Sequence, residues 1–345
     1  MKGSFFLGAD NDKKFAVRTM CFGELGAHDV LVRSMACGVC GTDVHIYHGE
    51  EGAAAVAPPV VLGHEFSGIV ERTGAEVTLV KPGDHVAVDP NMYCGLCRPC
   101  RMGRKQNCEN LFALGVNVNG GFAEYALCPD TQCFRIHDNV DFDVAAMTEP
   151  LACVIHGIDL AAIKPGQTVA VIGTGAIGFL MMQMAKLAGA STVILCAIDD
   201  ERKKLALELG ADYAINSRTE DLSARIREYT GCGGADVVIE CVGNTAATDQ
   251  AFKIAGYGAR VLLFSVPSPD ADYPLPLFDV YKKELTILGS LINPNTHQRA
   301  VNLINSGRLE IKKLITHTFP LSKVEDAINM QMRIESIKCI VHPQE

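Results

Sequence analysis

The chain has 345 residues, more than one ordinary hydrophobic core accommodates, and its length therefore predicts two domains. Its 48% hydrophobic and 21% charged residues are typical of a folded globular protein and exclude a disordered one. The net charge of −9 disfavours a nucleic-acid partner, and apolar runs of at most about a dozen residues are too short for the ~20 that a membrane span needs.

The first part of the chain, to about Leu151, is rich in glycine, proline and short runs of β-forming residues. The clearest of these runs are Val30–Arg33, Phe66–Arg72 and His85–Val88. Short runs separated by turn-forming residues are typical of strands joined by loops. We therefore expect a β-rich domain with long loops.

A polar loop in this part holds a group of cysteines spaced C-x2-C-x2-C-x7-C, namely Cys94, Cys97, Cys100 and Cys108. The residues between them offer almost nothing apolar to pack against, so unligated cysteines explain the group poorly. Four thiolates at about 2.3 Å saturate a tetrahedral Zn²⁺ and leave no open position. The spacing therefore predicts a structural zinc ion, which holds a loop and carries no chemistry.

Basic residues lie between these cysteines. Zinc ribbons can bind nucleic acid, which is one interpretation of such cations. We prefer a second interpretation, in which the cations offset the charge of a four-thiolate zinc site, because the chain as a whole is acidic. We expect neither a nucleic-acid nor a membrane partner. The basic residues are Arg98, Arg101, Arg104 and Lys105.

The chain contains 14 cysteines, and its first residues, Met1–Phe6, include one basic residue and no long apolar run that would indicate a secretory signal. Cysteines at this frequency without a secretory signal are typical of a reducing compartment. We expect a cytoplasmic protein without disulfides.

From Gln167 onward, short strands alternate with amphipathic helices. Alternation over this length predicts a parallel sheet with crossover helices, a doubly wound α/β domain of the Rossmann type. The tail beyond it contains a helix around Arg299–Ser306, ended by Gly307, but no strand partner of its own, and we expect it to return to the first domain. The expected strands are Thr168–Gly173, Thr192–Ala197, Tyr213–Asn216, Asp236–Val242, Ala259–Ser265 and Leu285–Gly289.

The first of these strands runs into a G-x-G-x-x-G motif that opens a long apolar helix. The first glycine permits a tight turn, the second lets the backbone approach the pyrophosphate of a dinucleotide, and the third lets helix and strand pack closely. Free N–H groups at the helix start then face the phosphates. The motif predicts an NAD(P)(H) site at Gly173, Gly175, Ala176, Ile177 and Gly178, to which we add Val242, Ser265 and Val266 at the ends of later strands.

Cofactor selectivity depends on the end of the next strand, roughly 20 residues past the last glycine, where an acidic residue binds the adenosine ribose. Two positions compete for this place, Ala197 and Asp199. If Asp199 holds it, NAD is favoured. If Ala197 holds it, the carboxylate that repels a 2′-phosphate is missing, and Arg202 can approach that phosphate instead. These residues alone leave both alternatives open.

Three shorter motifs accompany the cysteine loop and the glycine motif: Cys40-Gly-Thr-Asp-Val-His45, Gly63-His-Glu65 and Thr148-Glu-Pro-Leu151. Together, and in this order, they resemble the zinc-dependent medium-chain alcohol dehydrogenases, particularly the polyol (sorbitol) and L-threonine dehydrogenase branches. The resemblance covers essentially the whole chain. It implies a GroES-like catalytic domain over residues 1–151 and 291–345, and a Rossmann domain over residues 152–290.

The resemblance also implies a second, catalytic zinc ion, held by Cys40 and His64, with Glu65 and Glu149 completing or guarding its ligand shell. Asp43 would orient His64 from outside that shell. Two further cysteines close to these motifs, Cys37 and Cys153, are assigned to packing.

Thr42 and His45 match the family's proton relay, in which a hydroxyl, the cofactor ribose and an imidazole carry the alcohol proton to solvent. An open zinc position eases the loss of that proton, and hydride then passes from the alcohol carbon to the nicotinamide. The resemblance thus implies an NAD(P)-dependent dehydrogenase with two zinc ions per chain. Its register places Ala197 at the ribose position, which slightly favours NADP(H).

The expected substrate is a secondary alcohol, most closely a polyol, because Thr148–Cys153 looks like polyol dehydrogenase. Cys40–Tyr47 and Gly115–Tyr125 instead look like L-threonine dehydrogenase, and a 2,3-butanediol dehydrogenase-like activity is a further alternative. A non-catalytic dinucleotide sensor or structural protein is the alternative outside enzymes, against which the intact Cys40, His64 and Glu149 argue.

Relatives in this family form homodimers or homotetramers, often by pairing the edge strand near Leu285–Gly289, and we expect the same of this chain. The identity of the substrate depends on three segments that the sequence does not place, Tyr47–Pro58, Phe112–Asn119 and Leu291–His297.

Overall fold

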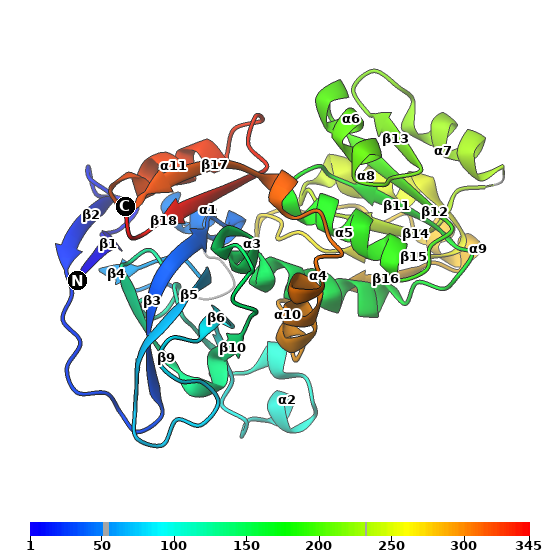
Figure 1. Ribbon diagram of the computed structural model, residues 1–345. Coiled ribbons are helices and arrows are strands. Elements are labelled where there is room, and N and C mark those ends of the chain that lie inside the picture. The colour runs from blue at the N-terminus through cyan, green and yellow to red at the C-terminus, as the bar shows by residue number, and fades with distance from the viewer. Residues whose placement is uncertain (51–54, 232) are drawn as a thin grey trace. The chain divides into compact units, whose positions relative to one another are not determined.

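The computed structural model describes residues 1–50, 55–231 and 233–345. The chain forms two compact units (Figure 1). Unit 1 contains Met1–Ala152 and Asn293–Glu345, and unit 2 contains Cys153–Ile292. Part of the expected substrate segment Tyr47–Pro58, residues 51–54, lies outside the described residues. Within the described residues, no helix is long and apolar enough to cross a membrane.

Unit 2 is built on the parallel sheet that the alternating pattern predicts. Its strands are ordered β13-β12-β11-β14-β15-β16, so the order reverses on either side of β11. In open parallel sheets, ligands bind outside the carboxyl ends of the strands at such a reversal. The strands are β11 (Thr168–Ile172), β12 (Thr192–Ala197), β13 (Tyr213–Asn216), β14 (Ala235–Glu240), β15 (Ala255–Leu263) and β16 (Thr286–Gly289).

Capping residues explain where several helices of unit 2 begin and end. Side-chain oxygens of Asp199, Asp221 and Asn244 accept hydrogen bonds at the starts of α6, α7 and α8, and Gly231 ends α7 at a φ of 60°. The helices are α4 (Thr148–Ala161, which begins in unit 1), α5 (Ala176–Leu187), α6 (Asp200–Glu208), α7 (Leu222–Thr230), α8 (Thr245–Ile254) and α9 (Leu277–Lys283).

Unit 1 is rich in β-structure, as its short apolar runs predict. Its largest sheet has the order β10-β6-β5-β3-β18-β17, with β9 also paired to β3. Smaller sheets have the orders β2-β1-β4 and β7-β8. The strands are β1 (Lys2–Phe6), β2 (Phe15–Thr19), β3 (Asp29–Gly38), β4 (Val60–Val61), β5 (Glu65–Thr73), β6 (His85–Val88), β7 (Asn91–Met92), β8 (Phe112–Ala113), β9 (Tyr125–Pro129), β10 (Cys133–Arg135), β17 (Ile315–Pro320) and β18 (Lys338–His342).

The C-terminal tail returns to unit 1, but the expectation that it lacks a strand partner is wrong. β17 and β18 pair in parallel with each other, and β18 pairs antiparallel with β3 through Ile340↔Gly38 and Val341↔Cys37. Every residue of β18 except His342 is buried. The last strand of the chain is therefore an interior strand of the sheet.

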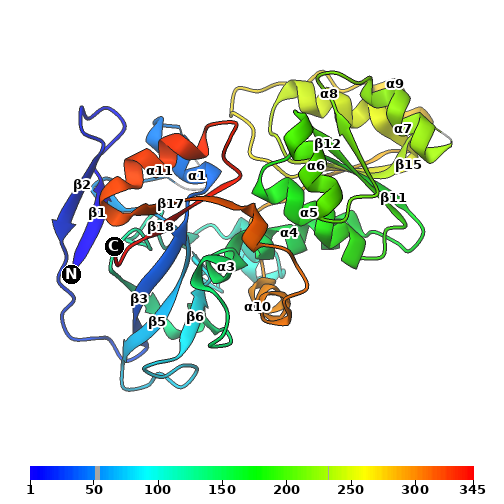
Figure 2. The same cartoon turned by 45° about the horizontal axis from the view of Figure 1, so that its top comes forward.

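The helices of unit 1 lie around this sheet. In both views α1 and α11 lie side by side (Figures 1 and 2), and the Tyr47 hydroxyl of α1 donates a hydrogen bond of 3.1 Å to Glu325 of α11. Gly307 ends α10 at a φ of 63°, the helix stop that the sequence predicts. The helices are α1 (Gly41–Tyr47), α2 (Arg98–Arg101), α3 (Phe142–Ala146), α10 (His297–Ser306) and α11 (Val324–Gln331).

Candidate metal centres and cofactor site

Four thiols converge in the loop that holds Cys94, Cys97, Cys100 and Cys108, where their sulfur atoms all lie within 4.8 Å of one another. The Sγ of Cys108 is 3.8 Å from that of Cys97 and 3.5 Å from that of Cys94. These separations are far longer than a disulfide bond. They match the roughly 3.8 Å between sulfurs that share a tetrahedral zinc at about 2.3 Å. The residues therefore fit a zinc ion.

Backbone N–H groups support the same interpretation. The N–H of Cys97 donates to Sγ of Cys94, and the N–H of Cys94 donates to Sγ of Cys108, each over 3.4 Å. Hydrogen bonds from the backbone of Cys97 and Leu96 lower the pKa of Cys94 to about 6, whereas burial raises the pKa of Cys100 to about 12. The thiol set thus contains a member that is readily ionised, as a metal ligand must be.

A second potential metal group lies where β3 leads into α1 and β5 begins. Cys40 is the N-cap of α1, His64 precedes β5, and Glu65 is the first residue of β5. One ligand atom from each lies within 4.8 Å of the others. Antiparallel pairing of β3 with β5 sets Gly38 opposite Glu65 and so brings these distant stretches together.

Asp43 lies beside this group and is completely buried. One carboxylate oxygen accepts a 2.8 Å hydrogen bond from the Cys40 N–H, and the other lies 3.8 Å from Nδ1 of His64. Burial by itself lowers the pKa of His64, but the charges on Cys40 and Asp43 raise it well above its usual range. This group of side chains is therefore rich in negative charge and suits an added cation.

Lys338 of β18 forms an ion pair with Glu65, and the side chains are only 4% and 2% exposed. Burial lowers the pKa of Lys338, but the charges on Glu65 and Cys40 raise it above its ordinary value. The sequence predicts Glu65 as a ligand or guard of the catalytic zinc. The structure adds that an ammonium group already binds this carboxylate, and would compete with a metal for it.

Glu149, the fourth residue predicted for the catalytic zinc, acts on this group through its charge. Glu149, the second residue of α4, is buried. Its charge raises the pKa of His64, although less than the charges of Cys40 and Asp43 do. It does not belong to the compact group of Cys40, His64 and Glu65 in the described part of the chain.

Thr42 and His45 lie on α1, and both are half-buried. The Nδ1 atom of His45 contacts the carboxylate of Glu50. Cys37 is fully buried, which raises the pKa of its thiol well above the ordinary value, and Cys153 lies in unit 2. The packing role expected of Cys37 agrees with this burial.

The glycine motif lies at the reversal of strand order in unit 2. Gly173 has a φ of +118°, and a Cβ on Gly178 would lie 2.0 Å from the Gly173 carbonyl oxygen, so neither tolerates a side chain. Gly175, the N-cap of α5, has nothing within 4 Å of its ideal Cβ and offers no side chain to cap the helix. This open space before the N–H groups of a helix fits a phosphate.

Comparisons with known proteins identify the family of the chain. Residues 26–138 match the family described as the alcohol dehydrogenase GroES-like domain, and residues 176–306 match the family described as zinc-binding dehydrogenase. An L-threonine 3-dehydrogenase from Bacillus licheniformis is 35% identical over 326 residues, 93% of each chain. The chain belongs to the zinc-binding dehydrogenase family.

Two further relatives extend this assignment. A sorbitol dehydrogenase from Bacillus subtilis is 32% identical over 96% of this chain and 95% of its own. The crystal structure of a zinc-binding dehydrogenase from Sinorhizobium meliloti 1021 bound to NADP is 40% identical, covers 99% of both chains and has a TM-score of 0.94. The expected two-domain α/β fold and oxidoreductase class are confirmed.

β12 and α6 carry the residues that the sequence predicts for the adenosine ribose of the dehydrogenase's cofactor. β12 ends at Ala197, and Asp199 accepts a 2.7 Å hydrogen bond from the N–H of Arg202 as the N-cap of α6. The Arg202 side chain is buried, and its Nη1 donates a 2.7 Å hydrogen bond to the Thr174 carbonyl oxygen. Arg202 therefore braces the glycine loop, a role that the sequence did not predict.

Val242, Ser265 and Val266 lie beside this loop. A Cβ on Gly173 would approach Val242, and one on Gly243 would approach Ser265 and Val266. Val242 and Val266 are exposed, at 46% and 55%. These side chains therefore belong to the same carboxyl edge of the sheet as the glycine motif.

Sequence reasoning missed Lys338 and Glu50. The available signal for Lys338 was a single cation within Ile337–Val341, an otherwise apolar run at the end of the chain. A lysine buried in such a run needs an anionic partner. Glu50 offered no comparable signal, because it lies in a polar segment of ordinary composition.

Proposed function

We propose that this dehydrogenase interconverts a secondary alcohol, most closely a polyol, and its ketone at a catalytic zinc held by Cys40, His64 and Glu149. The observation that carries the proposal is the convergence of Cys40, His64 and Glu65 beside the buried Glu149. A zinc ion bound there would act as a Lewis acid that lowers the pKa of an alcohol. A set of three protein ligands would leave the fourth position of a tetrahedral zinc open to a substrate oxygen.

Each residue of the proposed site has a separate task. Cys40 and His64 supply the sulfur and nitrogen that Zn²⁺ prefers. Asp43 anchors the Cys40 backbone and faces His64, so it fixes both ligands. Lys338 holds Glu65 by charge, so we assign the carboxylate ligand of the zinc to Glu149.

The alcohol proton requires an acceptor, and we assign this task to Thr42 and His45. The contact between Nδ1 of His45 and Glu50 would orient the imidazole and leave Nε2 as the proton acceptor. A second zinc ion at Cys94, Cys97, Cys100 and Cys108 would hold the loop and take no part in the reaction.

The most direct test combines metal analysis with substitution. We expect two zinc atoms per chain in the purified protein, and one in Cys40→Ser or His64→Ala, with turnover lost. Cys21→Ser, at an exposed cysteine outside both groups, is the matched control and should keep both metals and full activity. Full turnover by Cys40→Ser would refute the catalytic site.

Substrate class requires a panel of polyols, their phosphates, L-threonine and 2,3-butanediol with each nicotinamide cofactor. Oxidation of polyols by the purified enzyme supports the proposal. Oxidation of L-threonine alone would contradict it and favour the second candidate, L-threonine 3-dehydrogenase activity, to which the 35% identity with the Bacillus licheniformis enzyme points.

We infer a preference for NADP(H). The support is that Ala197 ends β12, that Asp199 caps α6, and that the similar Sinorhizobium meliloti structure was solved with NADP. The measurement is kcat/KM with NADP⁺ against NAD⁺, and a strong NAD⁺ preference would contradict the inference.

We also propose a homodimer or homotetramer in a reducing, cytoplasmic compartment. Both metal groups require reduced thiols. The helix before the edge strand β16 in the chain, α9, exposes the apolar residues Leu277, Phe278 and Tyr281. Light scattering should give a multiple of the 37.1 kDa chain mass. A single-chain mass at micromolar concentration would contradict the oligomer.

A further inference from the structure

The end of β12 is where an adenosine ribose is bound in a Rossmann domain. β12 pairs in parallel with β13, and the register sets Ala197 opposite Asn216. The N–H and hydroxyl of the next residue, Ser217, both donate to the Ala197 carbonyl oxygen, over 2.9 and 3.0 Å. The residues that follow β13 are therefore tied directly to the strand end that faces the ribose.

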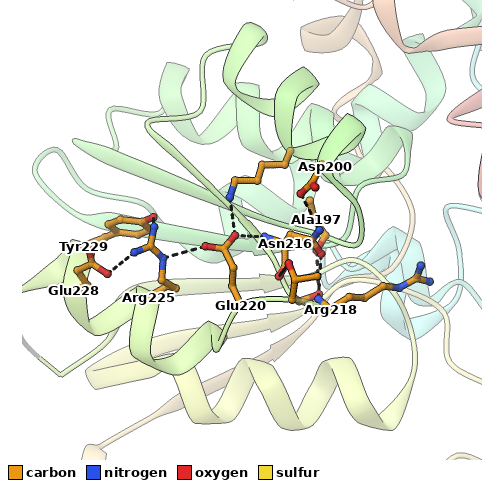
Figure 3. A network of polar contacts seen from close by, with 11 residues as sticks. Ala197, Asp200, Asn216, Arg218, Glu220, Arg225, Glu228 and Tyr229 are labelled. Atoms are coloured by element: carbon orange, nitrogen blue, oxygen red, sulfur yellow. Dashed lines mark hydrogen bonds and ion pairs between the residues drawn. The ribbon is translucent and has the colours of Figure 1, made fainter.

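The acidic residues at this edge already have partners. Asp199 caps α6, and Asp200 accepts a 2.9 Å hydrogen bond from the side-chain amide of Asn216. Glu220 binds Lys203 and Arg225 (Figure 3). These contacts give each of the three carboxylates a partner within the protein. The helix start also carries Glu201, which acts on the nearby Arg202.

Arg202, the cation that the sequence predicts for a 2′-phosphate, is committed elsewhere. Its guanidinium is buried and donates to the Thr174 carbonyl oxygen, and burial lowers its pKa. A side chain that braces the glycine loop cannot also turn toward a phosphate without giving up that contact. Another cation must therefore provide most of the attraction for a 2′-phosphate.

Arg218 is the cation at this edge with a free guanidinium. Its N–H donates a 3.1 Å hydrogen bond to the side-chain oxygen of Asn216, which fixes its backbone two residues beyond the partner of Ala197. Its side chain is exposed and makes no hydrogen bond or ion pair with the described residues. Figure 3 shows it extending away from the contacts of Glu220 and Arg225.

We propose that Arg218 is the residue that selects NADP(H), by binding the 2′-phosphate of the adenosine ribose beside Ala197. The inference rests on the proposed preference for NADP(H). A guanidinium presents paired N–H donors that match phosphate oxygens. The absence of a side-chain carboxylate at Ala197 leaves room for the phosphate, and the fixed Asn216–Arg218 backbone keeps the cation within reach of it.

Binding of cofactor fragments tests this without any turnover. Isothermal titration of the full-length protein with 2′,5′-ADP and with 5′-AMP measures the contribution of the 2′-phosphate alone. We expect the wild type to bind 2′,5′-ADP at least about tenfold more tightly, as for a hydrogen bond between charged groups. Arg218→Ala should lose most of this preference and keep the wild-type affinity for 5′-AMP, and Arg218→Lys should retain part of it.

Arg227→Ala is the matched control. Arg227 is an exposed arginine of the same unit, in the last turn of α7, and its loss changes the net charge equally. It should leave both affinities unchanged. Circular dichroism and the melting temperature of Arg218→Ala should equal those of the wild type, because the side chain is exposed.

The outcomes separate the two proposals. A wild type with equal affinity for the two fragments would overturn both the NADP(H) preference and the role of Arg218. A wild type that prefers 2′,5′-ADP, together with an Arg218→Ala variant that keeps this preference, would overturn the role of Arg218 alone. Loss of preference in Arg227→Ala as well would show a general charge effect and also overturn it.

Discussion

The ion pair of Lys338 and Glu65 makes substitution at either residue costly, because the surviving charge stays buried. We expect Lys338→Met to lower the free energy of unfolding by about 3–5 kcal/mol, and the double variant Lys338→Met/Glu65→Met to cost less than the sum of the two single changes. Urea denaturation of the four proteins measures this.

The control for that cycle is Lys323→Met, which removes an exposed lysine paired with Asp326 over 2.8 Å. Its side chain is 59% exposed, so its loss should cost at most about 1 kcal/mol. A Lys338→Met variant as stable as this control would contradict the coupling.

Gly175 offers a second test at the scale of one residue. Gly175→Ala should fold with unchanged stability, because nothing lies within 4 Å of the added methyl group and φ is −78°. Dinucleotide affinity should fall about tenfold or more, since the methyl group occupies the space for the pyrophosphate. The readouts are melting temperature and titration with NADPH.

Gly23→Ala, at an exposed glycine of unit 1 that also has nothing within 4 Å, controls for the substitution itself. Unchanged NADPH affinity in Gly175→Ala would mean that the cofactor does not approach this turn.

Residue spacing predicted the four-cysteine group, because thiols close in sequence leave a readable pattern, whereas Cys40, His64 and Glu65 were expected from the family resemblance. The four thiols of the Cys94–Cys108 loop do converge, as do Cys40, His64 and Glu65. Spacing could not show which contacts a long side chain prefers. Arg202 donates a hydrogen bond to the Thr174 carbonyl oxygen, and Glu65 forms an ion pair with Lys338, which is far away in the sequence.

At the scale of elements, a buried polar network connects α10 to Asp89, which precedes the loop of Cys94–Cys108 in the chain. The Asn293 side chain contacts Asp89 over 3.4 Å and Nδ1 of His297 over 3.5 Å. Burial lowers the pKa of His297 to about 3, whereas burial raises the pKa of Asp89 to about 6. The two groups therefore give the stability of this region opposite dependences on pH.

The sign for His297 follows from its depressed pKa. Below about pH 6.5 the unfolded chain binds a proton that the folded one refuses, so stability falls as the pH decreases. Asp89 has the opposite effect on stability. Below about pH 6 its carboxylate takes up a proton in the folded state before it does so in the unfolded chain, so it favours the folded state as the pH decreases. Between pH 7.5 and 5, protonation of His297 in the unfolded chain should lower the free energy of unfolding of the wild type by about 2 kcal/mol. In His297→Gln this loss should be absent.

Urea denaturation of wild type and His297→Gln at the two pH values measures the difference, with Asp89 present in both proteins. His137→Gln, at a histidine outside this network, should keep the wild-type slope. Parallel slopes for wild type and His297→Gln would contradict a neutral buried imidazole.

The bounds of the strands in unit 2 could be predicted closely from the sequence, because the strands of a parallel sheet covered by helices are continuous apolar runs. The expected Thr192–Ala197 and Tyr213–Asn216 have the bounds of β12 and β13. β17 and β18 escaped prediction because their pairing depends on β3, about 300 residues earlier, and no local pattern reports such a partner.

For the whole molecule, unit 1 depends on both ends of the chain. A chain truncated after Gly307 lacks β18, so β3 loses one of its paired strands and Glu65 loses Lys338. We expect this truncation to be insoluble or readily digested by protease. A chain lacking only Glu345 is the control and should behave as full length. A soluble, protease-resistant truncation would contradict the dependence.

The interior position of β18 also has a consequence for the order of events during synthesis. The ribosome makes most of unit 1 first, then all of unit 2, and only afterwards β18, the strand that completes the largest sheet of unit 1. Unit 2 is contiguous and can form while translation continues. Until β18 has left the ribosome, the nascent chain exposes an unfinished β-sheet and the carboxylate of Glu65 without its Lys338 partner, so we expect unit 1 to complete its folding after unit 2.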